Sequence, residues 1–365
     1  MSTLHTRRDV LLRTGAAAAI ADMGPRASGQ GAGKPATIAS VLGPIPFAQL
    51  GVTLPHEHPA AAWDWRIAQG PSAPPDNLTD AQRQEQRVAL LGFWGMLGAE
   101  LKRNGARTIV DARTEHSGRD VGLLQEIARR SELNILCSTG YYIESTRPRE
   151  FLSRGVEAAQ AYMVRELTEG ISSTGARAAV IKVAVGGRAG NASDDLLLRA
   201  AARAQKETGA PITTHATTPE SRRNMLDVFE RNGADMSRVA IGHADSNGSV
   251  EESAELLSRA GYVIYTVWGI TNPKLIGSTP LTADHSARLV RSLLDRGKTR
   301  QVMFSIDFSI YLHAGGIVLR LYDIPERTSN YVFTFAVPQL RKLGVSSEEI
   351  RQMMVDNPRR HLAGA

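Results

Sequence analysis

The feature that most constrains the fold of this chain is an alternation of short apolar runs with longer segments whose apolar residues recur at helical spacing. Segments 120–131, 193–209, 219–233 and 249–261 are predicted helices. No linker interrupts the pattern, so we predict an α/β fold, a single (β/α)8 TIM barrel over residues 37–363. The eight predicted strands are Gly51–Leu54, Arg107–Asp111, Asn134–Ser138, Ala178–Val183, Pro211–His215, Val239–His243, Tyr262–Thr266 and Val302–Asp307.

Composition and motifs exclude several other classes of protein. Hydrophobic residues make up 42% and charged residues 22% of the 365 positions, which excludes a disordered or fibrous chain. No Gly-x-Gly-x-x-Gly motif follows the first predicted strand, which disfavours a dinucleotide-binding fold. The single cysteine, Cys137, excludes an intrachain disulfide and a cysteine-based zinc module. Any metal must therefore be held by His, Asp, Glu or Lys.

The first 33 residues are predicted to be a targeting segment. Arg7 and Arg8 precede a short Ala-rich stretch, as in twin-arginine export signals, and a Pro/Ser/Gly-containing linker follows. The stretch is too short to span a bilayer, so we expect no stable membrane insertion and a periplasmic or secreted protein. The alternative is a disordered basic tail. No Lys/Arg run is interleaved with aromatic residues, so nucleic-acid binding is not expected.

The strongest local motif is Leu54-Pro55-His56-Glu57-His58 at the end of the first predicted strand. Alternation along a strand places His56 and His58 on one face and Glu57 on the other. Two imidazoles on one face can chelate one ion. The alternative is a pair of surface histidines in a loop.

Further candidate ligands end other predicted strands. His215 ends the fifth, His243 the sixth and Asp307 the eighth, while Lys182 lies inside the apolar fourth strand. In a barrel these strand ends meet at the C-terminal mouth, where catalytic groups lie. A charged Lys182 between Ile181 and Val183 would be costly to bury. Its amine either forms a carbamate that bridges metals, pairs with a carboxylate, or extends to solvent.

This set resembles the binuclear metal site of the phosphotriesterase family, within the amidohydrolase superfamily. The similarity extends to the stretches 51–58, 175–183, 211–215 and 241–243, and it covers residues 37 to 363. The resemblance implies that His56, His58 and Asp307 hold one divalent ion and that His215 and His243 hold a second. It also implies that a carbamylated Lys182, an N6-carboxylysine, bridges the two ions. Mixed nitrogen and oxygen ligands suit zinc.

The resemblance implies hydrolysis of an ester bond in a phosphotriester, lactone or carboxylic ester. A metal-bridging hydroxide would be the nucleophile, the metal on His215 and His243 would polarise the substrate, and Asp307 would accept the proton. Lys182 and Asp307 are therefore the expected catalytic residues. The alternatives are an amidohydrolase acting on a C–N bond and a non-catalytic periplasmic metal-binding barrel.

The sequence departs from the family where substrate specificity is set, because Ala244–Asn247 and Thr266–Gly269 lack the relay residues of the family's phosphotriesterases and lactonases. The expected pocket is aromatic and apolar, which favours a small hydrophobic ester as the substrate. The only protein partner we expect is a second copy of the chain, in a homodimer. The pocket residues we expect are Tyr142, Trp268, Phe308 and Tyr311.

Overall fold

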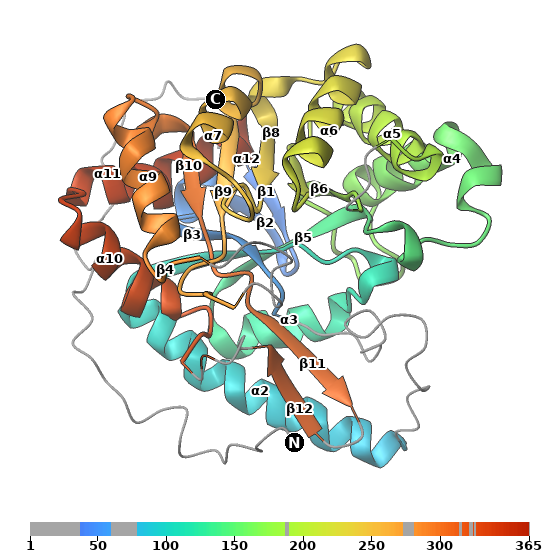
Figure 1. Ribbon diagram of the computed structural model, residues 1–365. Helices are drawn as coiled ribbons and strands as arrows, with labels where there is room; N and C mark the ends of the chain where they lie inside the picture. The colour runs from blue at the N-terminus through green and yellow to red at the C-terminus, as the bar shows by residue number, and fades with distance from the viewer. Residues whose placement is uncertain are drawn as a thin grey trace, which may run out of the picture.

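The computed structural model describes residues 37–59, 79–186, 190–272, 281–313, 316–320, 324 and 326–364. Its centre is a sheet of eight parallel strands whose order follows the chain (Figure 1). The first and last strands are joined, because the Asp307 amide donates to the His56 carbonyl at 3.2 Å and the His58 amide to the Phe308 carbonyl at 3.0 Å. The predicted barrel is thereby confirmed. Its strands are β3 (Val52–Glu57), β4 (Ala106–Asp111), β5 (Asn134–Tyr141), β6 (Val180–Ala184), β7 (Ile212–His215), β8 (Val239–Gly242), β9 (Tyr262–Tyr265) and β10 (Val302–Phe304).

Helices alternate with these strands and surround the sheet in Figure 1. Their ends follow local sequence signals. Thr79 forms a capping box with Gln82 at the start of the helix Asp80–Arg103. In the helix Ala192–Thr208, Asn191 is the N-cap and accepts from the Asp194 amide, and Gly209 is the C-cap, with a left-handed φ of 70°. The α-helices are α2 (Asp80–Arg103), α3 (Val121–Ser131), α4 (Phe151–Thr168), α5 (Ala192–Thr208), α6 (Pro219–Arg231), α7 (Val250–Arg259), α9 (His285–Asp295), α10 (Val337–Lys342), α11 (Ser347–Arg351) and α12 (Asn357–Ala363). Short 3-10 turns lie at Phe47–Gln49, Glu115–Ser117, Glu144–Thr146, Met236–Arg238 and Thr299–Gln301, and π-helical turns at Val332–Ala336 and Gln352–Asp356.

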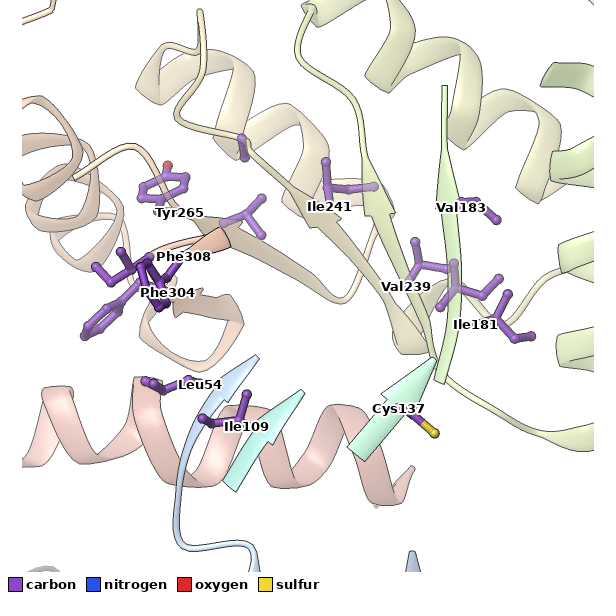
Figure 2. Packing of buried hydrophobic residues seen from close by; sticks show 14 of the residues in the cluster. Leu54, Ile109, Cys137, Ile181, Val183, Val239, Ile241, Tyr265, Phe304 and Phe308 are labelled. Atoms are coloured by element: carbon purple, nitrogen blue, oxygen red, sulfur yellow. The ribbon is translucent and has the colours of Figure 1, made fainter. Parts of the chain in front are cut away.

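The hydrophobic core divides between the two faces of the barrel wall. Ile181 and Val183 of β6 belong to the large cluster between strands and helices, part of which Figure 2 shows. Val180 belongs to a separate cluster with Leu136 and with Leu362 of α12. Successive side chains of a strand alternate between faces, so β6 directs Lys182 to the same side as Val180, into the barrel. Helix α12 lies at the end of the barrel where the strands begin, opposite the C-terminal strand ends that carry the candidate ligands.

Two added hairpins and several strand ends differ from the sequence-based expectation. Two antiparallel hairpins are added, β1–β2 (Thr37–Ser40 and Gly43–Pro46) and β11–β12 (Ser309–His313 and Gly316–Arg320), and the second lies beside α2 in Figure 1. The eighth strand stops at Phe304 rather than at Asp307, and the sixth stops before His243. His243 (φ 58°) directly follows β8, and Asp307 (φ 54°) follows β10 after Ser305 and Ile306; both are left-handed, and the chain turns away from the sheet at these residues.

The predicted export segment and linker, residues 1–33, lie outside the described residues. Within the described ranges, none of the helices combines the length and the apolar character needed to cross a membrane.

Candidate metal centre

His56 and His58 converge with Asp307 at the mouth of the barrel. Nε2 of His58 lies 2.9 Å from Oδ1 of Asp307, and Nε2 of His56 lies 4.0 Å from the same oxygen. One ligand atom from each of the three residues lies within 4.8 Å of the others. Burial alone would raise the pKa of Asp307, but the hydrogen bond from His58 holds it well below its usual value. Asp307 is therefore an anionic ligand at neutral pH.

Lys182 reaches the same place from inside the barrel. Its side chain is fully buried, and Nζ lies 2.9 Å from Nε2 of His56. Burial lowers the pKa of Lys182 to about 7, against the opposing attraction of Asp307 and Asp111. A large fraction of this amine is therefore neutral under physiological conditions.

His215 and His243 form the other side of the centre. Their ring centroids are 4.5 Å apart, and the His243 ring is 4.7 Å from that of His56. Burial lowers the pKa of His58 and of His243 to about 4 and holds the pKa values of His56 and His215 well below the usual histidine value. All four imidazoles are thus neutral at pH 7, the form in which histidine binds metals. The structure brings all six predicted ligand residues together.

The ligand atoms of these residues suit a divalent metal ion. Nε2 of His243 is buried and finds no hydrogen-bond partner among the described residues, although Nδ1 of the same ring is bound. A buried polar atom without a partner is costly, and a nitrogen lone pair directed at a cluster of ligands is stabilised by a cation. Imidazole nitrogens with a carboxylate oxygen form a ligand set that suits zinc.

The expected pocket residues do not share one environment. The Tyr142 ring lies 5.1 Å from the His215 ring, at the edge of the centre. The rings of Trp268 and Phe308 are core residues instead, with exposures of 1% and 0%, packed against Phe304 and Phe93 respectively. Both rings are covered by neighbouring side chains in the described part of the structure. The backbone of Tyr311 lies in β11, and its side chain is outside the described part of the structure.

Glu57, between the two histidines, has a function that the strand pattern did not reveal. Its carboxylate accepts hydrogen bonds from the Ser305 hydroxyl (2.5 Å), the Ile306 amide (2.8 Å), the Phe308 amide (3.1 Å) and the Ser329 hydroxyl (2.8 Å). Burial raises the pKa of Glu57 to about 7, and these hydrogen bonds oppose that rise. Because two of the donors flank Asp307, Glu57 fixes the turn that carries this ligand. The only signal in the sequence is an acidic residue on the core-facing side of an apolar strand.

Comparison with known proteins finds relatives and solved structures that cover most of the chain. The model of the phosphotriesterase family matches residues 36–362. A phosphotriesterase homology protein of Mycobacterium tuberculosis is 32% identical over 329 residues, covering 87% of this chain and 95% of that protein. An N-acetyltaurine hydrolase of Salmo salar is 25% identical, covering 89% and 97% of the two chains. A mutant organophosphorus hydrolase of Deinococcus radiodurans superimposes with a TM-score of 0.77 at 29% identity, covering 90% and 98%.

Proposed function

Because the chain belongs to the phosphotriesterase family, whose members are hydrolases, we propose that it is a metal-dependent hydrolase of a small hydrophobic ester. The observation that carries the proposal is the convergence of His56, His58 and Asp307 within 4.8 Å at the mouth of the barrel. The similarity to an organophosphorus hydrolase supports a phosphotriester as the substrate, and we keep lactones and carboxylic esters as the other members of the proposed ester class.

Two divalent ions, zinc in our proposal, would be held by the converging side chains. His56, His58 and Asp307 would hold one ion, and His215 and His243 the other. A carbamate on Lys182 would join the two positions, and its neutral precursor amine lies 2.9 Å from Nε2 of His56. When bound, such ions polarise a substrate oxygen and lower the pKa of a water molecule.

The residues of the chain itself divide the remaining work. Asp307 accepts the proton released by the attacking water, because its carboxylate is anionic and lies at the centre. Its side chain is 20% exposed, so a proton can pass from it to solvent. The His56 side chain is fully buried and excludes water from the inner side of the centre.

A second candidate is hydrolysis of an N-acyl amide. The specific observation that favours it is the similarity over 89% of this chain to a protein named N-acetyltaurine hydrolase. The same ligand set could polarise an amide carbonyl, so the difference between ester and amide must come from the substrate pocket.

A substrate panel tests the proposal. Purified zinc-loaded protein is assayed with aryl esters, lactones, phosphotriesters and N-acyl amides, beside Asp307→Asn and a matched control, Asp295→Asn, at an exposed helix end. We expect ester turnover that falls at least about 100-fold in Asp307→Asn and is unchanged in the control. Turnover of amides alone would favour the second candidate. Full metal loading without turnover of any compound would leave a metal-binding barrel.

A further inference from the structure

Thr266 lies one residue beyond β9 and contacts the metal centre through His243. Its hydroxyl oxygen is 2.7 Å from Nδ1 of His243, and the residue is 1% exposed. Thr266 was not among the ligands or pocket residues expected from the sequence. A hydrogen bond on the outer nitrogen of a metal-binding histidine fixes the orientation of the ring and the nitrogen that carries the proton.

The backbone of Thr266 is held from two sides. Its amide donates to both carboxylate oxygens of Asp245 at 3.0 Å, and its carbonyl accepts from the Arg327 guanidinium at 2.7 Å. Asp245 is itself held by the Val267 amide at 2.9 Å and the Ser286 hydroxyl at 2.7 Å. The hydroxyl of Thr266 therefore has little freedom to leave His243.

This contact occupies Nδ1 of His243 and leaves Nε2 as the nitrogen that can bind a metal. A neutral imidazole has one N–H donor and one acceptor nitrogen. If Nδ1 donates to the Thr266 oxygen, Nε2 keeps its lone pair toward the centre. Nε2 is buried with no partner of either kind among the described residues. A metal on Nε2 requires the proton of the neutral ring to be on Nδ1, where the Thr266 oxygen can accept it. The Thr266 hydroxyl thus suits the metal-bound ring, in which Nδ1 carries the proton and Nε2 faces the centre.

We propose that Thr266 is a positioning residue that fixes the ring orientation of His243 and accepts its Nδ1 proton when a metal is bound, and so selectively strengthens the metal position shared with His215. The inference rests on the proposed function, because it takes His243 as a ligand. The other position, on His56, His58 and Asp307, does not contact Thr266 and depends on it far less.

The test is a metal titration of the full chain. Metal-free protein is titrated with Zn²⁺ by calorimetry, comparing wild type with Thr266→Val, which keeps the side-chain shape and removes the hydroxyl. We expect one of two binding steps to weaken about 10- to 100-fold and the other to change little. Thr266→Ser, which restores a hydroxyl, should recover most of the affinity. The matched control is Thr139→Val, at a buried hydroxyl that has no partner among the described residues.

A second readout follows the proton itself. In nitrogen-15 NMR of zinc-loaded protein, the Nδ1 signal of His243 should shift in Thr266→Val and return in Thr266→Ser. Unchanged zinc affinities and an unchanged His243 signal in Thr266→Val would overturn the inference, as would an equal weakening of every binding step. Both readouts are independent of turnover. If the wild-type protein hydrolyses none of the substrates, the proposed function fails. If Thr266→Val nevertheless weakens one zinc-binding step, the role of Thr266 remains supported.

Discussion

Lys182 occupies a position where a free ammonium group is poorly stabilised, since it is fully buried and its Nζ lies 2.9 Å from a neutral imidazole nitrogen. An ammonium beside two divalent ions would also be repelled by them. A carbamate removes both difficulties, because it converts the cation into an anion with two ligand oxygens.

Removal of Lys182 should therefore remove metal. We expect Lys182→Ala to lose most of its bound zinc, measured by elemental analysis, and to regain part of it when propionate fills the vacated space. Reconstitution of wild-type protein should require dissolved carbon dioxide. Lys206→Ala, at an exposed position in α5, is the control. Full zinc loading in carbon-dioxide-free buffer, with an intact mass showing bare lysine, would contradict the carbamate.

Trp268 is a residue whose environment changes the expected effect of substitution. The sequence suggested an aromatic pocket wall, whereas the structure packs the ring 5.3 Å from that of Phe304, with Nε1 donating to the Tyr265 carbonyl. We expect Trp268→Ala to lower the free energy of unfolding by about 3–5 kcal/mol, measured by urea denaturation, through the cavity it creates. Trp268→Phe should cost less. A stable Trp268→Ala protein with altered substrate preference would restore the original expectation.

The sequence could identify those site residues whose placement depends only on their position along a single strand. His56, His58 and His215 are placed by alternation and by strand ends, so the barrel alone brings them together. Thr266 and Glu57 act on neighbouring strands instead, and their partners depend on the register between strands, which the sequence of either strand does not contain.

Among the elements, β3 is the strand on which closure of the barrel depends. Each carboxylate oxygen of Glu57 accepts two hydrogen bonds from the chain that follows β10. Closure and the placement of Asp307 are therefore one structural event. A glutamine at this position has only one acceptor oxygen, and its NH₂ group would face two donors.

We expect Glu57→Gln to destabilise the protein by about 2–5 kcal/mol, because two buried donors lose their acceptor. Hydrogen exchange at the Ile306 and Phe308 amides should accelerate more than exchange in β6, on the far side of the barrel. Ser329→Ala, which removes one donor and leaves the carboxylate, should cost only about 1 kcal/mol. Equal acceleration throughout the barrel would argue that Glu57 has no local effect on the turn.

Helix α12 carries a buried histidine remote from the metal centre. The His361 ring packs edge-on against Tyr262, and burial, assisted by Arg238, lowers its pKa to about 3. In the unfolded chain this histidine has an ordinary pKa near 6.5. The folded state therefore binds fewer protons between these values, and the stability contributed by neutral His361 is lost as the pH falls below 6.5.

At pH 5 this single group should cost about 2 kcal/mol of stability relative to pH 7.5. We expect His361→Phe, which keeps the ring contact with Tyr262, to lose less stability than wild type over that interval, measured by urea denaturation at each pH. Other buried histidines destabilise both proteins alike, so the difference isolates His361. Parallel pH curves for the two proteins would show that its ring is protonated in the folded state.

At the scale of the whole molecule, buried arginines connect the strand ends around the mouth. Arg147 donates to the carbonyls of Tyr142 and Ala184, and Arg222 to those of Ala216, His243 and Ser246. Arg147 pairs with Asp194 at 2.6 Å and Arg222 with Glu252 at 2.8 Å. These groups satisfy carbonyls that have left the ladder, so they hold neighbouring strand ends in fixed relative positions.

The barrel itself was predictable because eight apolar runs separated by helical segments admit few other arrangements. The arginine links were not, because nothing in the local sequence distinguishes Arg222 of α6 from the exposed Arg223 beside it. The β11–β12 hairpin was also missed, since the sequence after the last predicted strand lacks a clear alternating pattern.

The proposed ligands come from five separate places in the chain, β3, β6, β7, the turn after β8 and the turn after β10, so metal binding should stabilise the entire barrel. The centre does not exist before these strands are assembled, and an ion that binds only the folded state adds its binding free energy to the stability. With free zinc at about a thousand times the dissociation constant, one site contributes about 4 kcal/mol.

We expect removal of zinc by a chelator to lower the unfolding temperature, measured by calorimetry, by several degrees, and we expect readdition of zinc to restore it. In Asp307→Asn the chelator should have a smaller effect, because one position has lost its anionic ligand. If the chelator removes the metal from the wild-type protein and its unfolding temperature does not change, metal binding does not stabilise the assembly of these strands.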